Sequence, residues 1–87
     1  MNLFQKMIAS AFFNGYSLSF NYIKDDGSKK RRVLRTITDI TYNNDNDILV
    51  CGYIDIDDMG NHYRKFFLDN MSDPQVFKKI DPADLDF

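Results

Sequence analysis

The residues with the clearest chemical potential form two short stretches that combine cations with aromatic rings. Five of the eleven Lys and Arg residues lie at positions 29–35, in the run Lys-Lys-Arg-Arg-Val-Leu-Arg. Residues 63–68, Tyr-Arg-Lys-Phe-Phe-Leu, interleave two cations with three aromatic rings. Guanidinium and ammonium groups bind phosphates, and exposed rings stack on nucleobases. The two stretches therefore predict a face for an anionic, stackable ligand such as a nucleic acid or a nucleotide.

The predicted contact residues differ in the role that each side chain would have. The cations expected to meet phosphate-type anions are Lys29, Lys30, Arg31, Arg32, Arg35 and Arg64. The rings expected to stack on a ligand are Tyr53 and Tyr63. A strand sends alternate side chains to opposite faces, so at least two cations of residues 29–35 stay in solvent whichever face covers the core. A second interpretation remains open, in which these cations mark a charged edge strand that prevents sheet-to-sheet aggregation.

Two arginines have the parity of expected core residues. Arg35 shares its parity with Val33, the clearest core residue of the basic run, and with Ile37. An unpaired buried charge is costly, so we expect Arg35 to be semi-buried and paired with an internal or external anion. Arg64 shares its parity with the expected core residue Phe66 and is expected to project toward the mouth of a pocket.

Catalytic and metal-binding chemistry finds little support. His62 is the one histidine and lies in a predicted turn, while Cys51 lies inside an apolar strand, where a thiol is buried and unreactive. One Cys and one His cannot complete a zinc site. Residues 55–60 resemble a calcium loop, but its fifth position is Met and its twelfth is Phe66, where a bidentate Glu belongs. We expect no enzyme activity, no cofactor and no metal.

Composition places the chain among ordinary globular domains. It has 87 residues, 44% of them hydrophobic, with eight Phe and five Tyr to build one small core. A lone Cys permits no internal disulfide and favours a reducing, cytoplasmic setting. No targeting leader and no run of membrane-spanning length is present, so no membrane partner is expected. The net charge is −2, and every acid is Asp, which favours strands joined by Asp-rich turns.

The expected elements are one helix and five short strands. Apolar residues recur at helical spacing over residues 2–14, where Asn2 can cap the first turn and Asn14-Gly15 can end the last. The strands are expected at 16–22, at 29–35 with an irregular continuation to Tyr42, at 48–53, at 63–68 and at 76–77. The connections are a hairpin at Asp26-Gly27, a polar loop at 43–47 and a turn at 55–61. Phe67 is expected to pack under the helix, and Pro74 to lie on an edge or in a turn. The fold class is therefore α+β, with an N-terminal helix packed on a small, strongly bent five-stranded antiparallel sheet or partly open barrel.

Several of these residues fall into an ordered pattern. Leu18, Phe20 and Tyr22 fit a strand of the type aliphatic-x-aromatic-x-Tyr, and Gly27 fits the turn that follows. Arg31 and Val33 fit Arg-x-Val-x-Pro, with Arg35 in place of Pro. Arg64, Phe66 and Leu68 fit a closing Arg-x-Phe-x-Leu-x-Arg-Ile, with Asn70 and Met71 at its last two positions. Over residues 1–77 the chain thus resembles a WYL domain, a small Src-homology-type barrel of bacterial transcription regulators and phage-associated proteins.

The resemblance is incomplete, but it implies a ligand class and a role for two arginines. The Trp-Tyr-Leu triplet that names the family is Asp-Ile-Leu at residues 47–49, so only the Leu is retained. In the family the arginines line a ligand-sensing face for nucleic acids or nucleotides, which implicates Arg31 and Arg64. The helix-turn-helix usually attached to such domains is missing, which implies that the chain acts alone, forms homo-oligomers or binds another protein. We expect one WYL-like domain over residues 1–80 and a flexible acidic tail over 81–87.

Two functions remain open. The first is a small non-enzymatic regulatory module that binds a nucleic acid or nucleotide-type anion through a basic and aromatic sheet face. The second is a phage- or bacterium-encoded interaction module that binds and modulates a host protein. In the second, Leu85 and Phe87 of the tail would contact the partner, since the tail resembles the acidic tip of bacterial single-stranded-DNA-binding proteins and aromatic anchors dominate protein interfaces.

Overall fold

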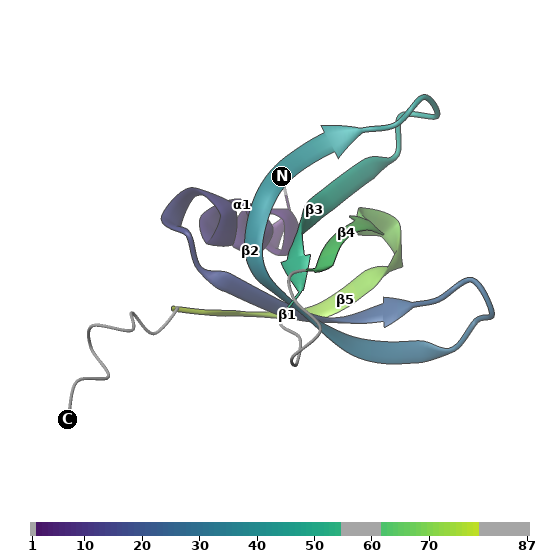
Figure 1. The fold of residues 1–87 in the computed structure, drawn as a ribbon, viewed down its shortest axis with the longest axis horizontal. Helices are drawn as coiled ribbons and strands as arrows, with labels where there is room; N and C mark the ends of the chain where they lie inside the picture. The colour runs from purple at the N-terminus through teal and green to yellow at the C-terminus, as the bar shows by residue number, and fades with distance from the viewer. Residues whose placement is uncertain (1, 55–61, 79–87) are drawn as a thin grey trace.

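The computed structural model describes residues 2–54 and 62–78, in which one helix precedes a single five-stranded sheet (Figure 1). The elements are α1 (Leu3–Asn14), β1 (Ser17–Ile23), β2 (Lys29–Tyr42), β3 (Ile48–Ile54), β4 (His62–Phe67), the 3-10 turn η1 (Leu68–Asn70) and β5 (Met71–Phe77). The strand order is β4-β3-β2-β1-β5, and every neighbouring pair is antiparallel. The sheet is bent but not closed, so the predicted fold class is confirmed.

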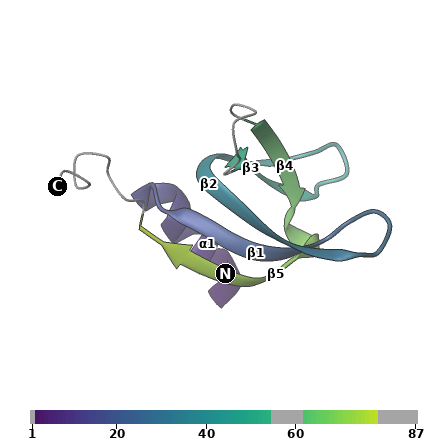
Figure 2. The same cartoon turned by 60° about the horizontal axis from the view of Figure 1, so that its bottom comes forward.

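The helix begins and ends where the sequence predicts. The Asn2 side-chain oxygen accepts a hydrogen bond from the Gln5 amide (2.7 Å), and the Gln5 side chain accepts one from the Asn2 amide (3.1 Å), which completes a capping box. Gly15 ends the helix in the left-handed region, with φ of 68°. Ile8 and Ala11 are buried against the sheet, and Figure 2 shows α1 lying along β1 and β5.

Two hairpins project from the sheet as separate arms (Figure 1). In the β1–β2 loop the Lys24 amide donates to the Ser28 carbonyl (2.8 Å), and the Gly27 amide donates to the Lys24 carbonyl (2.9 Å). Gly27 has φ of 83°. It is therefore the left-handed residue that a three-residue hairpin loop requires. The polar loop between β2 and β3 has the same bonding pattern, with Asn46 (φ 63°) in the equivalent place. Both predicted connections are confirmed.

The core lies between α1 and the concave side of the sheet. Its buried members are Ile8, Ala11, Leu18, Phe20, Leu34, Ile37, Val50, Phe66 and Met71. Cys51, on the opposite side of β3 from Val50, is also buried, so the middle of β3 is covered on both faces as expected for its apolar run.

The prediction for the middle of β2 was wrong in its choice of core residue. Leu34 is fully buried, whereas Val33 is only half-buried. The register with β3 shifts between Leu34 and Thr36, because a β-bulge inserts one residue there. As a result Leu34 and Ile37 both face the core although they are three residues apart. Arg35 lies between them and is exposed, not semi-buried.

The bend also depends on a close approach between β2 and β3. A Cβ atom on Gly52 would lie 1.9 Å from the Thr36 carbonyl oxygen, so β2 can approach β3 this closely only beside a residue without a side chain.

Three expectations about the C-terminal half need correction. β5 begins at Met71, five residues before the expected strand, because a register irregularity around Asp73 (φ 50°) lets it continue along β1. Phe67 is 39% exposed on the outermost strand β4, whereas α1 packs on β5, β2 and β1, so Phe67 does not pack under the helix as predicted. His62 begins β4 and is not part of a turn. Pro74 lies on the outer strand β5, as predicted.

The predicted turn at 55–61 and the tail at 81–87, with Leu85 and Phe87, lie outside the described residues. Within residues 2–54 and 62–78, no helix combines the length and the apolar character needed to cross a bilayer.

Candidate anion-binding site

A hollow of about 470 Å³ lies between the β1–β2 hairpin and the outermost strand β4. We call it the cationic hollow. It is lined by Tyr22, Lys24, Asp25, Asp26, Arg32, Lys65, Phe66 and Phe67. Three strands and one hairpin loop thus bring cations and aromatic rings together, although the two halves of the hollow are more than thirty residues apart in the sequence.

Arg32 is held over an aromatic cluster at the floor of the hollow. Its register partner is Phe20 of β1, so its side chain lies on the core side of the hairpin. The Arg32 Cζ atom lies 5.6 Å from the centroid of the Phe66 ring, within the range of a cation–π contact. Phe66 is buried and makes edge-to-face contacts with Phe20 (5.0 Å) and Tyr22 (4.9 Å). The guanidinium therefore rests on rings that are themselves fixed by packing.

The N–H groups of Arg32 have no partner among the described residues. Among residues 2–54 and 62–78 the ring of Phe66 is its one specific partner, and no hydrogen bond or ion pair engages its N–H groups. A guanidinium has five N–H donors in a planar fork that matches a phosphate or carboxylate. The exposed side chains of Lys24 and Lys65 stand at the walls of the same hollow.

The walls of the hollow are tied to each other by one hydrogen bond. The Phe67 amide on β4 donates to the Tyr22 hydroxyl at the end of β1 (3.1 Å). β1 and β4 are not neighbours in the sheet, so this bond bridges the gap that the open sheet leaves. It holds the hairpin and β4 in the relative position that forms the hollow.

Two carboxylates also line the hollow, and one of them is already engaged. Asp26 accepts hydrogen bonds from the Ser28 hydroxyl (2.5 Å) and the Ser28 amide (2.9 Å). The hydroxyl bond is the largest of the effects that lower the pKa of Asp26, followed by the amide bond, and nearby Lys24 adds to them. Three cations face two carboxylates, a local excess of one positive charge in a chain whose net charge is −2.

Arg31 lies on the other side of the hairpin and already has internal partners. Its Nε donates to the Ser19 hydroxyl (2.8 Å), and one terminal nitrogen donates to the Asp73 carbonyl (2.8 Å) and to the Asn21 side-chain oxygen (3.3 Å). These bonds join β2 to β1 and to the irregular part of β5. The structure thus gives Arg31 a structural role and separates it from Arg32.

The predicted stacking residues form a second cluster on β3 and β4. Tyr53 and Tyr63 are register partners, exposed on the surface, with ring centroids 5.6 Å apart and planes at 69°. Arg35 directly precedes Thr36, the register partner of Tyr53 on β2. We call Arg35, Tyr53 and Tyr63 the tyrosine patch. Arg64 follows Tyr63 and donates to the Tyr63 carbonyl (3.0 Å).

The pKa of the Tyr63 phenol is raised above its ordinary value. A hydrogen bond with Thr38 lowers the pKa of Tyr63, but burial of the hydroxyl together with the neighbouring Cys51 thiol and Asp39 carboxylate outweighs it, and the net pKa is raised. The ring is therefore a neutral stacking surface at physiological pH.

The structure brings together only part of the predicted set. Arg32 lies in the cationic hollow, and Lys29 and Lys30 are exposed on the same hairpin, Lys30 beside Tyr22 in the register. Lys24 and Lys65 were missed as site residues. Lys24 and Lys65 lie near each other only because β4 folds back toward the β1–β2 loop. No short sequence pattern predicts that contact. The interleaving of cations and rings at residues 63–68 was the one available hint for Lys65.

Comparison with protein-family models, with curated proteins and with solved structures finds no match to this chain.

Proposed function

We propose that the protein is a small non-enzymatic regulatory module that binds a nucleic acid or nucleotide-type anion in the cationic hollow. The main support is Arg32, held over Phe66 with its N–H groups unengaged by the described residues and flanked by Lys24 and Lys65. A cation fixed beside exposed rings contacts phosphate and base at once, which is how sequence-tolerant single-strand binders work.

Each wall of the hollow has a part in this proposal. Arg32 and the two lysines neutralise phosphate oxygens. Phe67, with 39% of its surface exposed at the rim, offers a face for a base. Lys29 and Lys30 on the same hairpin raise the local positive potential and speed the encounter with an anion. A longer single strand would reach the tyrosine patch, because Lys65 and Tyr63 lie two residues apart on β4.

The WYL-like pattern supports the same ligand class, with one change of residue. The resemblance implicates Arg31, but the partners of Arg31 are Ser19, Asn21 and the Asp73 carbonyl. We assign the ligand contact to Arg32 instead. The buried, unpaired Cys51 suits the reducing cytoplasm in which such a regulator would act.

The test is a binding titration at low salt. A labelled oligothymidylate of about ten nucleotides and labelled ATP serve as probes, and heparin serves as a polyanion without bases. We expect Arg32→Ala to weaken oligothymidylate binding at least about tenfold, as the loss of a good bidentate contact does. Lys6→Ala is the matched control, because Lys6 is an exposed cation on α1 outside the hollow.

The proposal fails if neither nucleic probe binds, or if Arg32→Ala and Lys6→Ala have the same effect. If heparin alone binds, the hollow recognises polyanions without recognising bases. That result would also contradict the proposal.

A further inference from the structure

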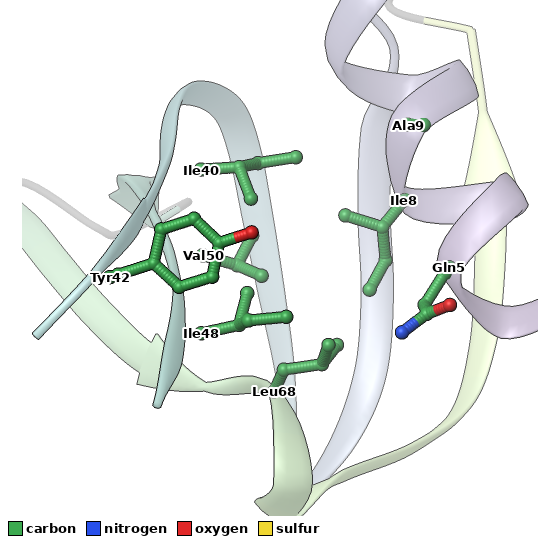
Figure 3. Close-up of a pocket in the computed structure, with 8 residues that line it drawn as sticks. All are labelled: Gln5, Ile8, Ala9, Ile40, Tyr42, Ile48, Val50 and Leu68. Atoms are coloured by element: carbon green, nitrogen blue, oxygen red, sulfur yellow. The ribbon is translucent and has the colours of Figure 1, made fainter. Parts of the chain in front are cut away.

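A second concave surface lies away from the cationic hollow and has a different chemistry. It is a groove of about 360 Å³ between α1 and the part of the sheet near the β2–β3 hairpin. We call it the apolar groove. Its lining residues are Gln5, Ile8, Ala9, Ile40, Tyr42, Ile48, Val50 and Leu68. Figure 3 shows Gln5, Ile8 and Ala9 of the helix on one side, facing the strand residues and Leu68 on the other.

The groove exposes large apolar side chains in one place. Ile8 and Val50 at its base are buried, but Ile40 is 37% and Tyr42 68% exposed at its edge. Single exposed apolar residues are ordinary, whereas several that converge on a concave surface mark a docking site. The Gln5 side-chain oxygen is occupied by the Asn2 amide, which leaves the Gln5 N–H₂ group as a donor for a bound backbone carbonyl.

The groove has an acidic border. Ile48 lines both the apolar groove and an adjoining hollow, whose other lining residues include Asp47 and Asp69. Asp47 accepts a hydrogen bond from the Asn43 side chain (3.2 Å), while within the described part of the chain the Asp69 carboxylate has no partner. An occupant of the groove thus meets apolar side chains first and then negative charge at the side of η1.

Charge disfavours two simple occupants. The C-terminal residues 81–87 contain three Asp and no Lys or Arg, so they would bring like charges to Asp47 and Asp69. A second copy of the chain has a net charge of −2 and is disfavoured for the same reason. The same charges favour a partner that carries Lys or Arg.

We infer that the apolar groove docks a short amphipathic segment of another protein, in which a stripe of apolar side chains is flanked by Lys or Arg. The apolar stripe would fill the space between α1 and β2–β3, as in helix-in-groove recognition. The cations would pair with Asp69 and Asp47 and set the direction of the segment. This inference does not rest on the anion site: the apolar groove has no lining residue in common with the cationic hollow, although the acidic hollow beside the groove shares Phe67 with it.

The probe is a synthetic helical peptide with Leu at every third or fourth position and Lys elsewhere. Two matched peptides replace Lys by Glu or Leu by Ser. With the full chain, we expect the Leu–Lys peptide to bind with a Kd in the micromolar range, and both matched peptides to bind at least about tenfold more weakly. Fluorescence anisotropy gives the affinities, and methyl NMR shifts of Ile40 and Ile48 report where the peptide lies.

Variants distinguish docking from general attraction to an acidic protein. Ala9→Trp fills the groove from the helix surface and should abolish binding. Asp69→Asn should weaken it about two- to fivefold, the range for the loss of an exposed charge pair. Asp45→Asn makes the same charge change on an exposed side chain that does not line the groove, and should have no effect.

The inference is overturned if the Leu–Lys peptide does not bind at about 1 mM, or if Ala9→Trp and Asp69→Asn bind it as well as the native chain does. It is also overturned if a double change of Leu85→Ser and Phe87→Ser tightens peptide binding tenfold, because the groove would then belong to the chain's own C-terminus. A dimer that Ala9→Trp dissociates would assign the groove to a second copy, with the same consequence.

Discussion

Arg31 and Arg32 are neighbours on β2 but lie on opposite faces of the hairpin and have different partners. Arg31 is engaged by Ser19, Asn21 and the Asp73 carbonyl, whereas Arg32 rests on Phe66 with its N–H groups unengaged by other described residues. The alternation of side chains along a strand puts them on opposite faces. Their partners come from β5 and β4, so the basic run alone could not reveal which arginine stabilises the fold and which is available to a ligand.

The two arginines should therefore respond in opposite ways to substitution. Arg31→Ala removes two short hydrogen bonds of 2.8 Å made by a charged donor, and we expect the free energy of unfolding to fall by about 1–2 kcal/mol. Its oligothymidylate affinity should change by less than about threefold, whereas Arg32→Ala should lose affinity and keep most of its stability. Urea unfolding and anisotropy on the same samples measure both quantities. A larger loss of affinity in Arg31→Ala than in Arg32→Ala would reverse the assignment.

The Ser28 contact with Asp26 predicts a pH effect with a definite sign. The pKa of Asp26 is lowered in the folded protein, first by the Ser28 hydroxyl, so the ionised carboxylate stabilises the loop above its ordinary pKa of 3.8. This contribution is lost as the pH falls through the lower, folded-state pKa. In Ser28→Ala we expect the pKa of Asp26 to move back up toward 3.8, as measured by NMR titration of the carboxyl carbon. An unchanged pKa would show that the hydroxyl is not the main cause. The neutral-pH fold should be the same in both proteins.

At the scale of elements, the predicted features are those whose signals lie close together in the sequence. Asn2 and Gln5 cap the helix from three residues apart, and Gly15 and Gly27 provide positive φ where the chain must turn. Such signals can be interpreted without tertiary contacts. The sequence also contained the alternation of β1, in which Leu18 and Phe20 are both buried.

The missed features depend on how one strand pairs with its neighbour. The bulge between Leu34 and Thr36 puts Leu34 and Ile37 on the same face of the sheet, and it lies beside the close approach of the Thr36 carbonyl to Gly52 of β3. The extension of β5 back to Met71 likewise depends on contacts of Asp73 with Asn21 and Arg31. Parity counted along a single strand fails as soon as a bulge inserts a residue.

Gly52 gives the sharpest test of the bent sheet. In Gly52→Ala the new methyl group would meet the Thr36 carbonyl oxygen at 1.9 Å, and backbone cannot yield as a flexible side chain can. We expect a loss of about 2–3 kcal/mol in the free energy of unfolding, typical of overpacking. Gly27→Ala is the comparison: its Cβ would meet open space, and only the φ of 83° is strained, so about 1 kcal/mol should be lost. Thermal and urea unfolding rank the two variants, and a milder effect in Gly52→Ala would contradict the proposed close approach.

At the scale of the molecule, the two hairpins place opposite chemistries at separate sites. Residues of the β1–β2 arm line the cationic hollow, and residues of the β2–β3 arm line the apolar groove, beside which Asp47 and Asp69 line an adjoining hollow. The net charge of −2 for the whole chain does not reveal that cations and carboxylates gather at different sites. A module with two such surfaces could hold an anion and a basic partner segment at the same time.

The separation predicts independent binding. Ala9→Trp should leave oligothymidylate affinity unchanged, and Arg32→Ala should leave Leu–Lys peptide affinity unchanged, each within about twofold, because the apolar groove and the cationic hollow have no lining residue in common. Oligothymidylate binding should weaken with a salt slope near −2 on logarithmic axes, about −0.7 for each of the three cations of the hollow. Anisotropy titrations at several salt concentrations provide the values. A variant that weakens both ligands equally would point to one shared surface.

The bond between the Tyr22 hydroxyl and the Phe67 amide has a consequence for self-assembly. β4 is an outermost strand, and the backbone of such a strand is a template on which other molecules can stack into fibrils. Tyr22 removes one of those free amides at the end of the strand, while Asp73-Pro74 interrupts the opposite margin of the sheet. Loss of a single phenol oxygen, as in Tyr22→Phe, would thus leave the interior packing in place and still make the protein more prone to amyloid growth on storage.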